Sequence, residues 1–178
     1  MQELEQDIIL ARKGNKEAFV RLIKANELSL YNVARSILKQ DENCADAIQE
    51  TILKAYRSIH TLKEPAFFKT WMFRILINEC NTILRREKKV IVSDKLLIDS
   101  SSMDRYGNID LQKAIEQLEE TLRLVVTLHY YEDISLKGIS EILGTPEGTV
   151  KSRLHRARQI LAEFLEGTKE RKVGYESY

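Results

Sequence analysis

The stretch "LGTPEGTVKSRLHRARQIL", residues 143–161, decides the fold of the C-terminal part of the chain. Gly144 can take the left-handed conformation that ends a helix. Thr145 is a suitable N-cap for a following helix, with Pro146 in the first helical position. The stretch therefore predicts a tight turn between two short helices. These are expected at residues 136–143 and 147–165.

Both helices have one apolar face, and the second also has a basic one. Ser135 is a suitable N-cap for the first helix. The residues expected to face inward are Leu136, Ile139, Ile142 and Leu143, then Val150, Leu154, Ala157, Leu161 and Phe164. The remaining surface carries Lys151, Ser152, His155, Arg156 and Arg158, with Arg153 at its flank. This pattern is typical of a helix-turn-helix, whose second helix enters the DNA major groove. A solvated basic face on an ordinary amphipathic helix is the alternative.

Charge is distributed unevenly although the net charge is only +1. Residues 41–53 carry four acids and no base, whereas residues 151–158 carry four Lys or Arg and no acid. Partners respond to such local asymmetry rather than to the net charge. We therefore expect one acidic and one basic face.

The whole chain is predicted to be all-helical. It has 7 glycines and 2 prolines, and apolar residues recur at spacings of three and four. Besides the two C-terminal helices, helices are expected over residues 3–13, 16–39, 41–59 and 66–88, and from Asp110 onward. Apolar runs fall short of the ~20 residues that cross a membrane, so a cytoplasmic protein is expected. Cys44 and Cys80 lack the spacing of a zinc site and are expected to be buried thiols.

The helix at 41–59 has an acidic surface that could bind a partner. Asp41 is a plausible N-cap for it, as Gly14 and Asn15 are plausible end and start signals for the helices before it. Its expected inward stripe is Ala45, Ile48, Ile52, Ala55 and Ile59. This turns Asp46, Gln49, Glu50 and Leu53 outward, toward a basic partner or simply toward solvent.

The helix at 66–88 interleaves aromatic and basic residues. The aromatic residues are Phe67, Phe68, Trp71 and Phe73, and the bases are Lys69, Arg74, Arg85, Arg86, Lys88 and Lys89. Proteins bind unpaired nucleotides by stacking the bases on aromatic rings and by neutralising the phosphate backbone with basic side chains. Core packing is the other explanation, which helical spacing favours for Trp71 and Ile75 and leaves open for the rest.

Residues 90–109 lose helical periodicity and end in serine, glycine and asparagine, which is typical of a linker. We therefore predict two small helical domains joined by a flexible linker. Their expected bounds are 1–89 and 110–166, with a frayed tail at 167–178.

These motifs resemble the sigma-70 family of bacterial RNA polymerase sigma factors, in particular the extracytoplasmic-function (ECF) group. "GTVKSRLHRAR" is similar to the family's region 4, which reads the −35 promoter element. "DENCADAIQETILKAYRSI" and "KEPAFFKTWMFRILINECNTILRREKK" are similar to region 2, which docks on polymerase and opens the −10 element. The resemblance covers about residues 15–89 and 110–165, in the family's order.

The resemblance implies three sets of site residues. The −35 set is Lys151, Ser152, Arg153, His155, Arg156 and Arg158. The −10 set is Phe67, Lys69, Trp71, Arg74, Asn78, Arg85 and Arg86, with residues 63–70 as the specificity loop. The polymerase-binding set is Asp46, Gln49, Glu50 and Leu53. Thr82 departs from the family, which usually has Asp there, so local contacts or sequence preference differ at this point.

The implied partners are promoter DNA and core RNA polymerase, through the clamp helices of its largest subunit and the flap of its second-largest subunit. An anti-sigma factor, often membrane-bound in this group, is also implied and could hold the protein at the membrane. His60, His129 and His155 stand alone in sequence, and no nucleophile, metal cluster or phosphate loop is apparent, so neither an enzyme nor a cofactor is expected. Two other functions stay open: a helix-turn-helix regulator that acts without core polymerase, and a helical adaptor whose basic helix binds an acidic protein.

Overall fold

The structure is a computed structural model that describes residues 2–93 and 109–173, and the side chains of 3–88 and 111–165. All secondary structure in these ranges is helical, which confirms the predicted all-α class. The chain divides into two compact units. The first holds α1 to α4, and the second holds α5, α6, η3, the start of α7 and α8. The expected linker falls mainly on residues 94–108, outside the described part.

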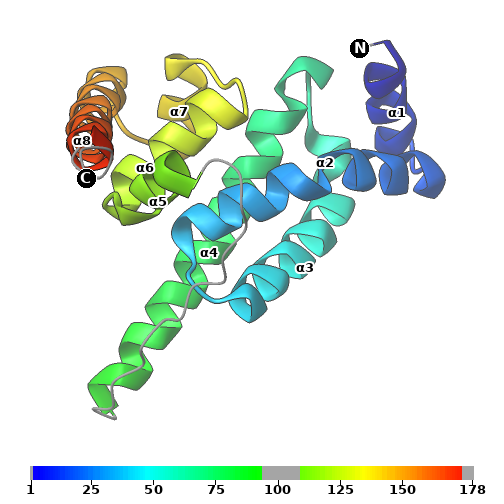
Figure 1. The fold of residues 1–178 in the computed structure, drawn as a ribbon. Coiled ribbons are helices and arrows are strands. Elements are labelled where there is room, and N and C mark those ends of the chain that lie inside the picture. Colours follow the sequence, from blue (N-terminus) through cyan, green and yellow to red (C-terminus); the bar gives the residue numbers. More distant parts are fainter. Residues whose placement is uncertain (1, 94–108, 174–178) are drawn as a thin grey trace. The chain divides into compact units, whose positions relative to one another are not determined.

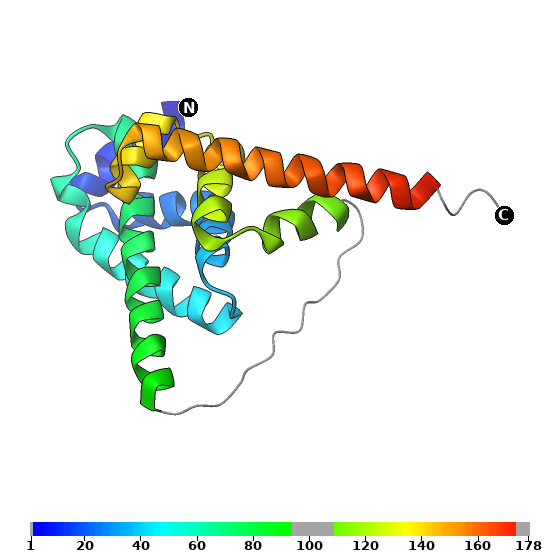
Figure 2. The ribbon, with the colours of Figure 1, turned by 90° about the vertical axis from the view of Figure 1, so that its left-hand side faces the viewer.

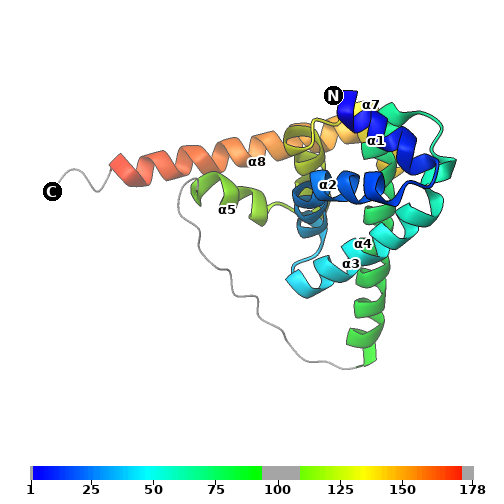
Figure 3. The same cartoon turned by 90° about the vertical axis from the view of Figure 1, so that its right-hand side faces the viewer.

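Within residues 2–93, the first unit contains four α-helices and two short 3₁₀ turns (Figure 1). They are α1 (Gln2–Arg12), α2 (Lys16–Ile37), α3 (Asp41–Ser58), η1 (Ile59–Thr61), η2 (Pro65–Phe67) and α4 (Phe68–Ser93). Helices α2, α3 and α4 pack against one another, and α1 packs on α2. Their fully buried large side chains are Leu22, Leu30, Val33, Leu38, Met72, Phe73 and Leu76. Helix α4 extends beyond α2 and α3 at its C-terminal end (Figure 3), five residues further than the predicted end at Lys88.

Two of the three predicted helix boundaries in this unit are confirmed. Gly14 has φ +92° after α1, and the Asn15 side chain accepts a 2.8 Å hydrogen bond from the Ala18 N–H. The predicted N-cap at Asp41 is wrong, because α3 starts at Asp41 and Gln40 occupies the cap position without a side-chain bond. The Asp41 carboxylate instead accepts a 3.0 Å hydrogen bond from the Tyr31 hydroxyl, which draws it toward α2.

The buried face of α3 differs from the predicted stripe. The buried residues are Cys44, Ala47, Thr51 and Ala55, followed by Ile59. Ala45 is exposed, and Ile48 and Ile52 are half-buried. Both sets have helical spacing, so periodicity alone does not separate them. Because α3 contacts both α2 and α4, the face with small side chains, which allow close approach, is the one buried.

Both cysteines are buried and form no disulfide, as predicted. Burial raises the pKa of the Cys44 thiol to about 11. The thiol is therefore neutral at physiological pH and acts as a small apolar group of the core.

The second unit contains α5 (Ile109–Gln117), α6 (Glu120–Val126), the π-helical turn η3 (Thr127–Tyr131), residues 136–140 of α7 (Leu136–Leu143) and α8 (Glu147–Val173). The packing of α5 and α6 on α8 can be followed in Figure 2. The buried apolar residues of the second unit include Leu118, Leu122, Val125, Leu128, Ile139, Val150 and Leu154. Helix α8 runs past the predicted end at residue 165 and takes in residues 167–173 of the expected tail.

The turn between α7 and α8 follows the prediction except at its cap. The Ser135 hydroxyl accepts a hydrogen bond from the Gly138 N–H at 3.1 Å, and Gly144 has φ +61°. The Thr145 hydroxyl, however, is buried and makes no hydrogen bond, so its predicted capping role is wrong. The Pro146 carbonyl accepts from the Thr149 and Val150 N–H groups, which makes Pro146 the residue before α8 rather than its first. Ser140 holds Thr145 instead, by donating a 2.7 Å hydrogen bond to its carbonyl.

Candidate nucleic-acid and protein interfaces

The start of α8 presents the predicted basic surface. Val150, Leu154 and Ala157 are buried. The exposed residues are Lys151, Ser152, His155, Arg156 and Arg158, whereas Arg153 is half-buried at the flank. Steps of three and four residues produce this separation, because they return to the same side of a helix. The remaining residues predicted to face inward, Leu136, Leu143, Leu161 and Phe164, are only half-buried.

The side chains on this surface differ in how firmly they are held. Ser152 donates its hydroxyl proton to the Thr149 carbonyl at 2.9 Å, so toward a ligand it can only accept. Arg158 donates from Nε to the Tyr130 hydroxyl at 2.6 Å. Within the described residues, no hydrogen bond or ion pair engages Lys151 or Arg156. Their charged ends are therefore available to base edges or phosphates.

The aromatic residues near the start of α4 separate into buried and exposed ones. Phe68 and Phe73 are 2% and 0% exposed, whereas Phe67 is 56% exposed. Trp71 is half-buried, with its ring centroid 6.1 Å from that of Phe68. Assigning Trp71 and Ile75 to the core was therefore wrong, because both are only half-buried. The buried face of α4 lies next to Trp71 and Ile75 around the helix. Its residues are Phe68, Met72, Phe73, Leu76, Ile77 and Cys80.

Five of the seven residues predicted for the −10 element share one face of η2 and α4. They are Phe67, Trp71, Arg74, Asn78 and Arg85, at steps of four, three, four and seven. Lys69 lies off this face, with its Nζ 5.7 Å from the Phe73 ring centroid. Arg86 lines a cavity toward α3 instead. The structure thus brings together a row of aromatic, basic and amide groups, all exposed except the half-buried Trp71, and leaves out two predicted members.

The four predicted polymerase-binding residues of α3, Asp46, Gln49, Glu50 and Leu53, are all exposed, as expected. Asp46, Gln49 and Glu50 line one side of a cavity of about 450 Å³, and Glu79, Thr82, Ile83 and Arg86 of α4 line the other. Lys54 lies in the same lining and bridges to Glu79, with Nζ to Oε1 at 2.6 Å. The surface is therefore less purely acidic than the sequence of α3 indicated, because Lys54 and Arg86 balance part of its charge.

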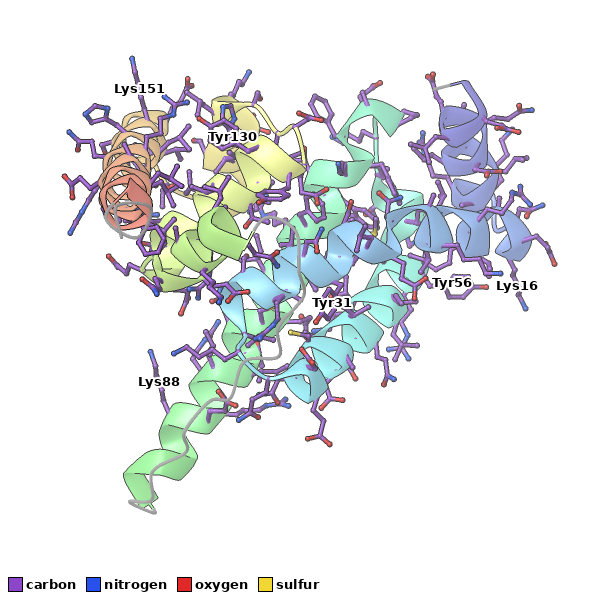
Figure 4. All side chains as sticks on the ribbon, in the orientation of Figure 1. Lys16, Tyr31, Tyr56, Lys88, Tyr130 and Lys151 are labelled. Atoms are coloured by element: carbon purple, nitrogen blue, oxygen red, sulfur yellow. The ribbon has the colours of Figure 1, made fainter. Side chains whose placement is uncertain are left out.

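An apolar groove between α2 and α3 was not predicted. Its open volume is about 620 Å³, and most of its lining surface is apolar. The lining residues are Leu28, Tyr31, Ala45 and Ile48, with Lys24, Glu27, Asp41 and Gln49 beside them. Leu28 is 71% exposed, and Tyr31 lies between the two helices (Figure 4). Leu28 lies off the buried stripe of α2. This off-stripe apolar residue was the signal in the sequence that could have revealed the groove.

Other kinds of site find no support in the described part of the chain. No group of three or more His, Cys, Asp or Glu in residues 2–93 and 109–173 could hold a metal ion. In the same ranges, no helix is long and apolar enough to span a membrane.

In a comparison with known proteins, both units match models of one protein family. The family model "Sigma-70 region 2" matches residues 17–90, and "Sigma-70, region 4" matches residues 109–161. RNA polymerase sigma factor SigV of Bacillus subtilis is 32% identical over 153 residues, which cover 84% of this chain and 92% of SigV. The chain belongs to the extracytoplasmic-function group of the sigma-70 family. Sigma factors are non-catalytic specificity subunits, so this sigma factor binds core RNA polymerase and directs it to promoters.

Further relatives agree with this assignment. The ECF sigma factor SigW of Bacillus subtilis is 27% identical over 180 residues, covering 91% of this sigma factor and 96% of SigW. The solved structure of the sigma factor RpoE from Bartonella quintana, in complex with the anti-sigma factor NepR, superposes with a TM-score of 0.72 at 29% identity. It covers 83% of this chain and 96% of RpoE. The CnrH chain, at 22% identity and TM-score 0.65 over 93% of this chain and 98% of its own, supports the fold alone.

Proposed function

We propose that the three predicted surfaces divide the work of promoter recognition. The start of α8 contacts the −35 element, the exposed face of η2 and α4 captures the opened −10 strand, and α3 binds core polymerase. The observation that carries the proposal is the separation of these surfaces from the core. Exposed cations of α8 and α4 and the exposed Phe67 ring of η2 face outward, while apolar residues of the two helices such as Val150, Leu154 and Met72 are buried.

The −35 contact is proposed for Lys151, Arg156 and their exposed neighbours on α8. Lys and Arg recognise guanine in the major groove, and they also neutralise phosphates. Ser152 can accept from a base amino group because its proton is engaged within the helix. Arg153, which is half-buried, is proposed as a flank contact to the backbone.

The −10 contact is proposed for the face formed by Phe67, Trp71, Arg74, Asn78 and Arg85. Opening a base pair and extruding a base costs a few kcal/mol, which stacking and a polar pocket must offset. The exposed Phe67 ring offers stacking, and Asn78 offers both a donor and an acceptor for a base edge. Melting is thus proposed to depend on the exposed ring of η2, while its buried neighbour Phe68 anchors the turn.

Core polymerase is proposed to bind α3 through Asp46, Gln49, Glu50 and Leu53. Leu53 is 50% exposed and supplies apolar area next to these polar side chains. An anti-sigma factor is proposed to compete for this unit, because the α2/α3 groove exposes apolar side chains that a protein partner would cover. RpoE, which is similar to this chain, was solved with its anti-sigma factor NepR.

Run-off transcription tests the proposal directly. Purified core polymerase is assayed with and without the protein on a library of genomic promoter fragments. New start sites that depend on the protein are expected. Their absence would refute the promoter-recognition proposal, and DNA binding that is indifferent to core polymerase would favour the independent helix-turn-helix regulator. Binding to acidic proteins without promoter selectivity would favour the adaptor.

Matched charge variants test the polymerase surface. Glu50→Lys is expected to weaken binding to core polymerase, because it reverses a charge in the proposed contact. Glu42→Lys places the same reversal on an exposed residue in the first turn of α3 and is expected to change core affinity much less. Equal effects of the two variants would show that only net charge matters.

A second pair tests the −35 surface. Arg156→Ala is expected to weaken promoter binding by about 1–3 kcal/mol if Arg156 contacts a base through two hydrogen bonds. Gln159→Ala, an exposed neutral residue almost one turn further along α8, is the control. An Arg156→Ala loss that is the same on every DNA sequence would assign Arg156 to phosphate instead.

A further inference from the structure

Tyr130 and Arg158 form an exposed pair that joins two elements of the second unit. They are 28 residues apart, in η3 and α8. The Arg158 Nε donates a 2.6 Å hydrogen bond to the Tyr130 hydroxyl, and the guanidinium carbon lies 5.6 Å from the centre of the tyrosine ring. Both side chains are exposed. The arginine is therefore held in place at the surface, whereas nothing in the described residues holds Lys151 in this way.

The tyrosine itself is held by its local structure. The π-helical turn η3 closes with a hydrogen bond from the Glu132 N–H to the Thr127 carbonyl at 3.2 Å. The His129 ring packs edge-to-face on the Tyr130 ring, with centroids 4.9 Å apart. His129 Nδ1 lies 3.0 Å from the Ile134 carbonyl, which can only accept, so Nδ1 is the donor. The histidine is thereby fixed, and it supports one side of the tyrosine ring.

This pair leaves a set of donors for an anion. The Nε of Arg158 is used by Tyr130, but its terminal amino groups have no partner among the described side chains. The tyrosine hydroxyl accepts from Arg158 and so can still donate its own proton. Two parallel guanidinium N–H groups match two oxygens of a phosphate, and a preorganised guanidinium loses less freedom on binding.

The position of the pair on α8 indicates which phosphate it could reach. Lys151, His155 and Arg158 share one face at steps of four and three. Seven residues of helix span about 10 Å, which is close to the ~12 Å width of the major groove. With Lys151 at the base edges, Arg158 lies near the groove wall, where the phosphates are. Figure 4 shows Lys151 projecting outward from the start of α8, and Tyr130 in the same unit.

We propose that Tyr130 is a positioning residue that presents Arg158 to one backbone phosphate at the edge of the −35 element. The inference rests on the proposed −35 contact of α8 and adds a residue outside that helix. It assigns Arg158 to the DNA backbone rather than to a base. Tyr130 thereby affects how firmly the recognition helix is seated and not which sequence it prefers.

The test uses the full chain with core polymerase and a set of promoter duplexes, each with one neutral methylphosphonate in or beside the −35 element. Tyr130→Phe removes only the hydroxyl and keeps the ring. Tyr131→Phe is the matched control, because Tyr131 is a neighbouring tyrosine with a similar exposure of 54% against 52%. Arg158→Ala and the double variant with Tyr130→Phe complete the set. Heat unfolding followed by circular dichroism verifies that each variant is folded.

The expected result is a localised loss. Tyr130→Phe should weaken binding about 3- to 10-fold, within the range for the net loss of one typical hydrogen bond, with base preference unchanged. At one phosphate position, or at two adjacent ones, methylphosphonate substitution should no longer weaken binding of Tyr130→Phe or Arg158→Ala. At the other positions it should weaken binding as it does for the wild type. Arg158→Ala should also lower the salt dependence by about one phosphate. The double variant should bind no more weakly than Arg158→Ala alone, and Tyr131→Phe should match the wild type.

Other results overturn the inference. An unchanged affinity of Tyr130→Phe, a loss spread equally over all methylphosphonate positions, or additive effects in the double variant would each show that Tyr130 does not act through Arg158. A shift in base preference would show that Arg158 reads a base. If the wild-type protein with core polymerase showed no preference for promoter duplexes, the proposed −35 function would fail as well, and this outcome differs from all the others.

Discussion

Two adjacent phenylalanines should have opposite roles in stability and DNA binding. Phe68 is 2% exposed and Phe67 is 56% exposed. A buried phenylalanine removes about 200 Å² from water, which at about 25 cal/mol per Å² sets an upper limit near 5 kcal/mol. Phe68→Ala should therefore destabilise the first unit by about 3–5 kcal/mol, the usual range for such a deletion. Phe67→Ala leaves no closed cavity and should cost less than about 1.5 kcal/mol.

The assay is urea unfolding followed by tryptophan fluorescence. Trp71 is the single tryptophan of the chain and lies in the first unit, so its signal reports this unit within the full protein. With a slope of about 2 kcal/mol per M, Phe68→Ala should lower the midpoint by about 2 M, and Phe67→Ala by less than about 1 M. Phe68→Leu retains most of the volume and should fall between wild type and Phe68→Ala.

The same variants should rank in the reverse order for binding a single-stranded −10 oligonucleotide. Loss of a stacking ring costs about 1–3 kcal/mol per base. In the absence of urea, Phe67→Ala should therefore weaken oligonucleotide binding roughly 5- to 150-fold. Equal midpoint shifts for the two alanine variants would refute the burial argument. Unchanged oligonucleotide affinity in Phe67→Ala would refute its proposed stacking role.

Four further outcomes are expected. Asn15→Ala should destabilise the first unit by about 1 kcal/mol in the fluorescence assay, because the Ala18 N–H loses its 2.8 Å acceptor. The hydrogen bond from Arg21 lowers the pKa of Asp7 below its ordinary value of 3.8. The stabilisation from this pair is therefore present above the unfolded-state pKa and lost as the pH falls through the folded one. The unfolding midpoints of wild type and Asp7→Asn should differ at neutral pH and converge in acid; a constant difference would contradict this. Gly144→Ala should destabilise the protein by about 1 kcal/mol in heat unfolding, because the Gly144 φ is +61°, although the space around it is open. Gly148 is helical and has equally open space, so Gly148→Ala should instead stabilise the protein by about 0.4–1 kcal/mol.

Local signals predicted the helices of this sigma factor well. The ends of α1 and α7, the Asn15 and Ser135 caps and the left-handed Gly144 all follow from interactions within a few residues of sequence. Two predicted N-cap positions were wrong. Asp41 and Thr145 were each placed one residue away from the cap that forms, because Tyr31 and Ser140 hold those segments by contacts from outside the following helix.

The buried face was predicted more fully on α8 than on α3 and α4. Helix α8 has one buried face and a single basic surface opposite it, so periodicity alone assigned its exposed residues. Helices α3 and α4 each have two helical stripes with acceptable spacing, and their packing on neighbouring helices selects one of the two. Periodicity therefore placed Trp71 in the core and Ala45 on the buried stripe, whereas the structure buries Phe73 and Cys44.

The sequence by itself determined the helical class, the turn before α8, the basic row on that helix and the order of the family motifs. These depend on backbone preferences, capping and spacing, which act within one or two turns. The tertiary structure alone decided which stripe of α3 and α4 is buried, that Arg86 lies beside the acids of α3, and that Tyr130 meets Arg158 28 residues away. Such contacts depend on the directions in which packed helices approach one another, and the direction of approach is not a property of any single helix.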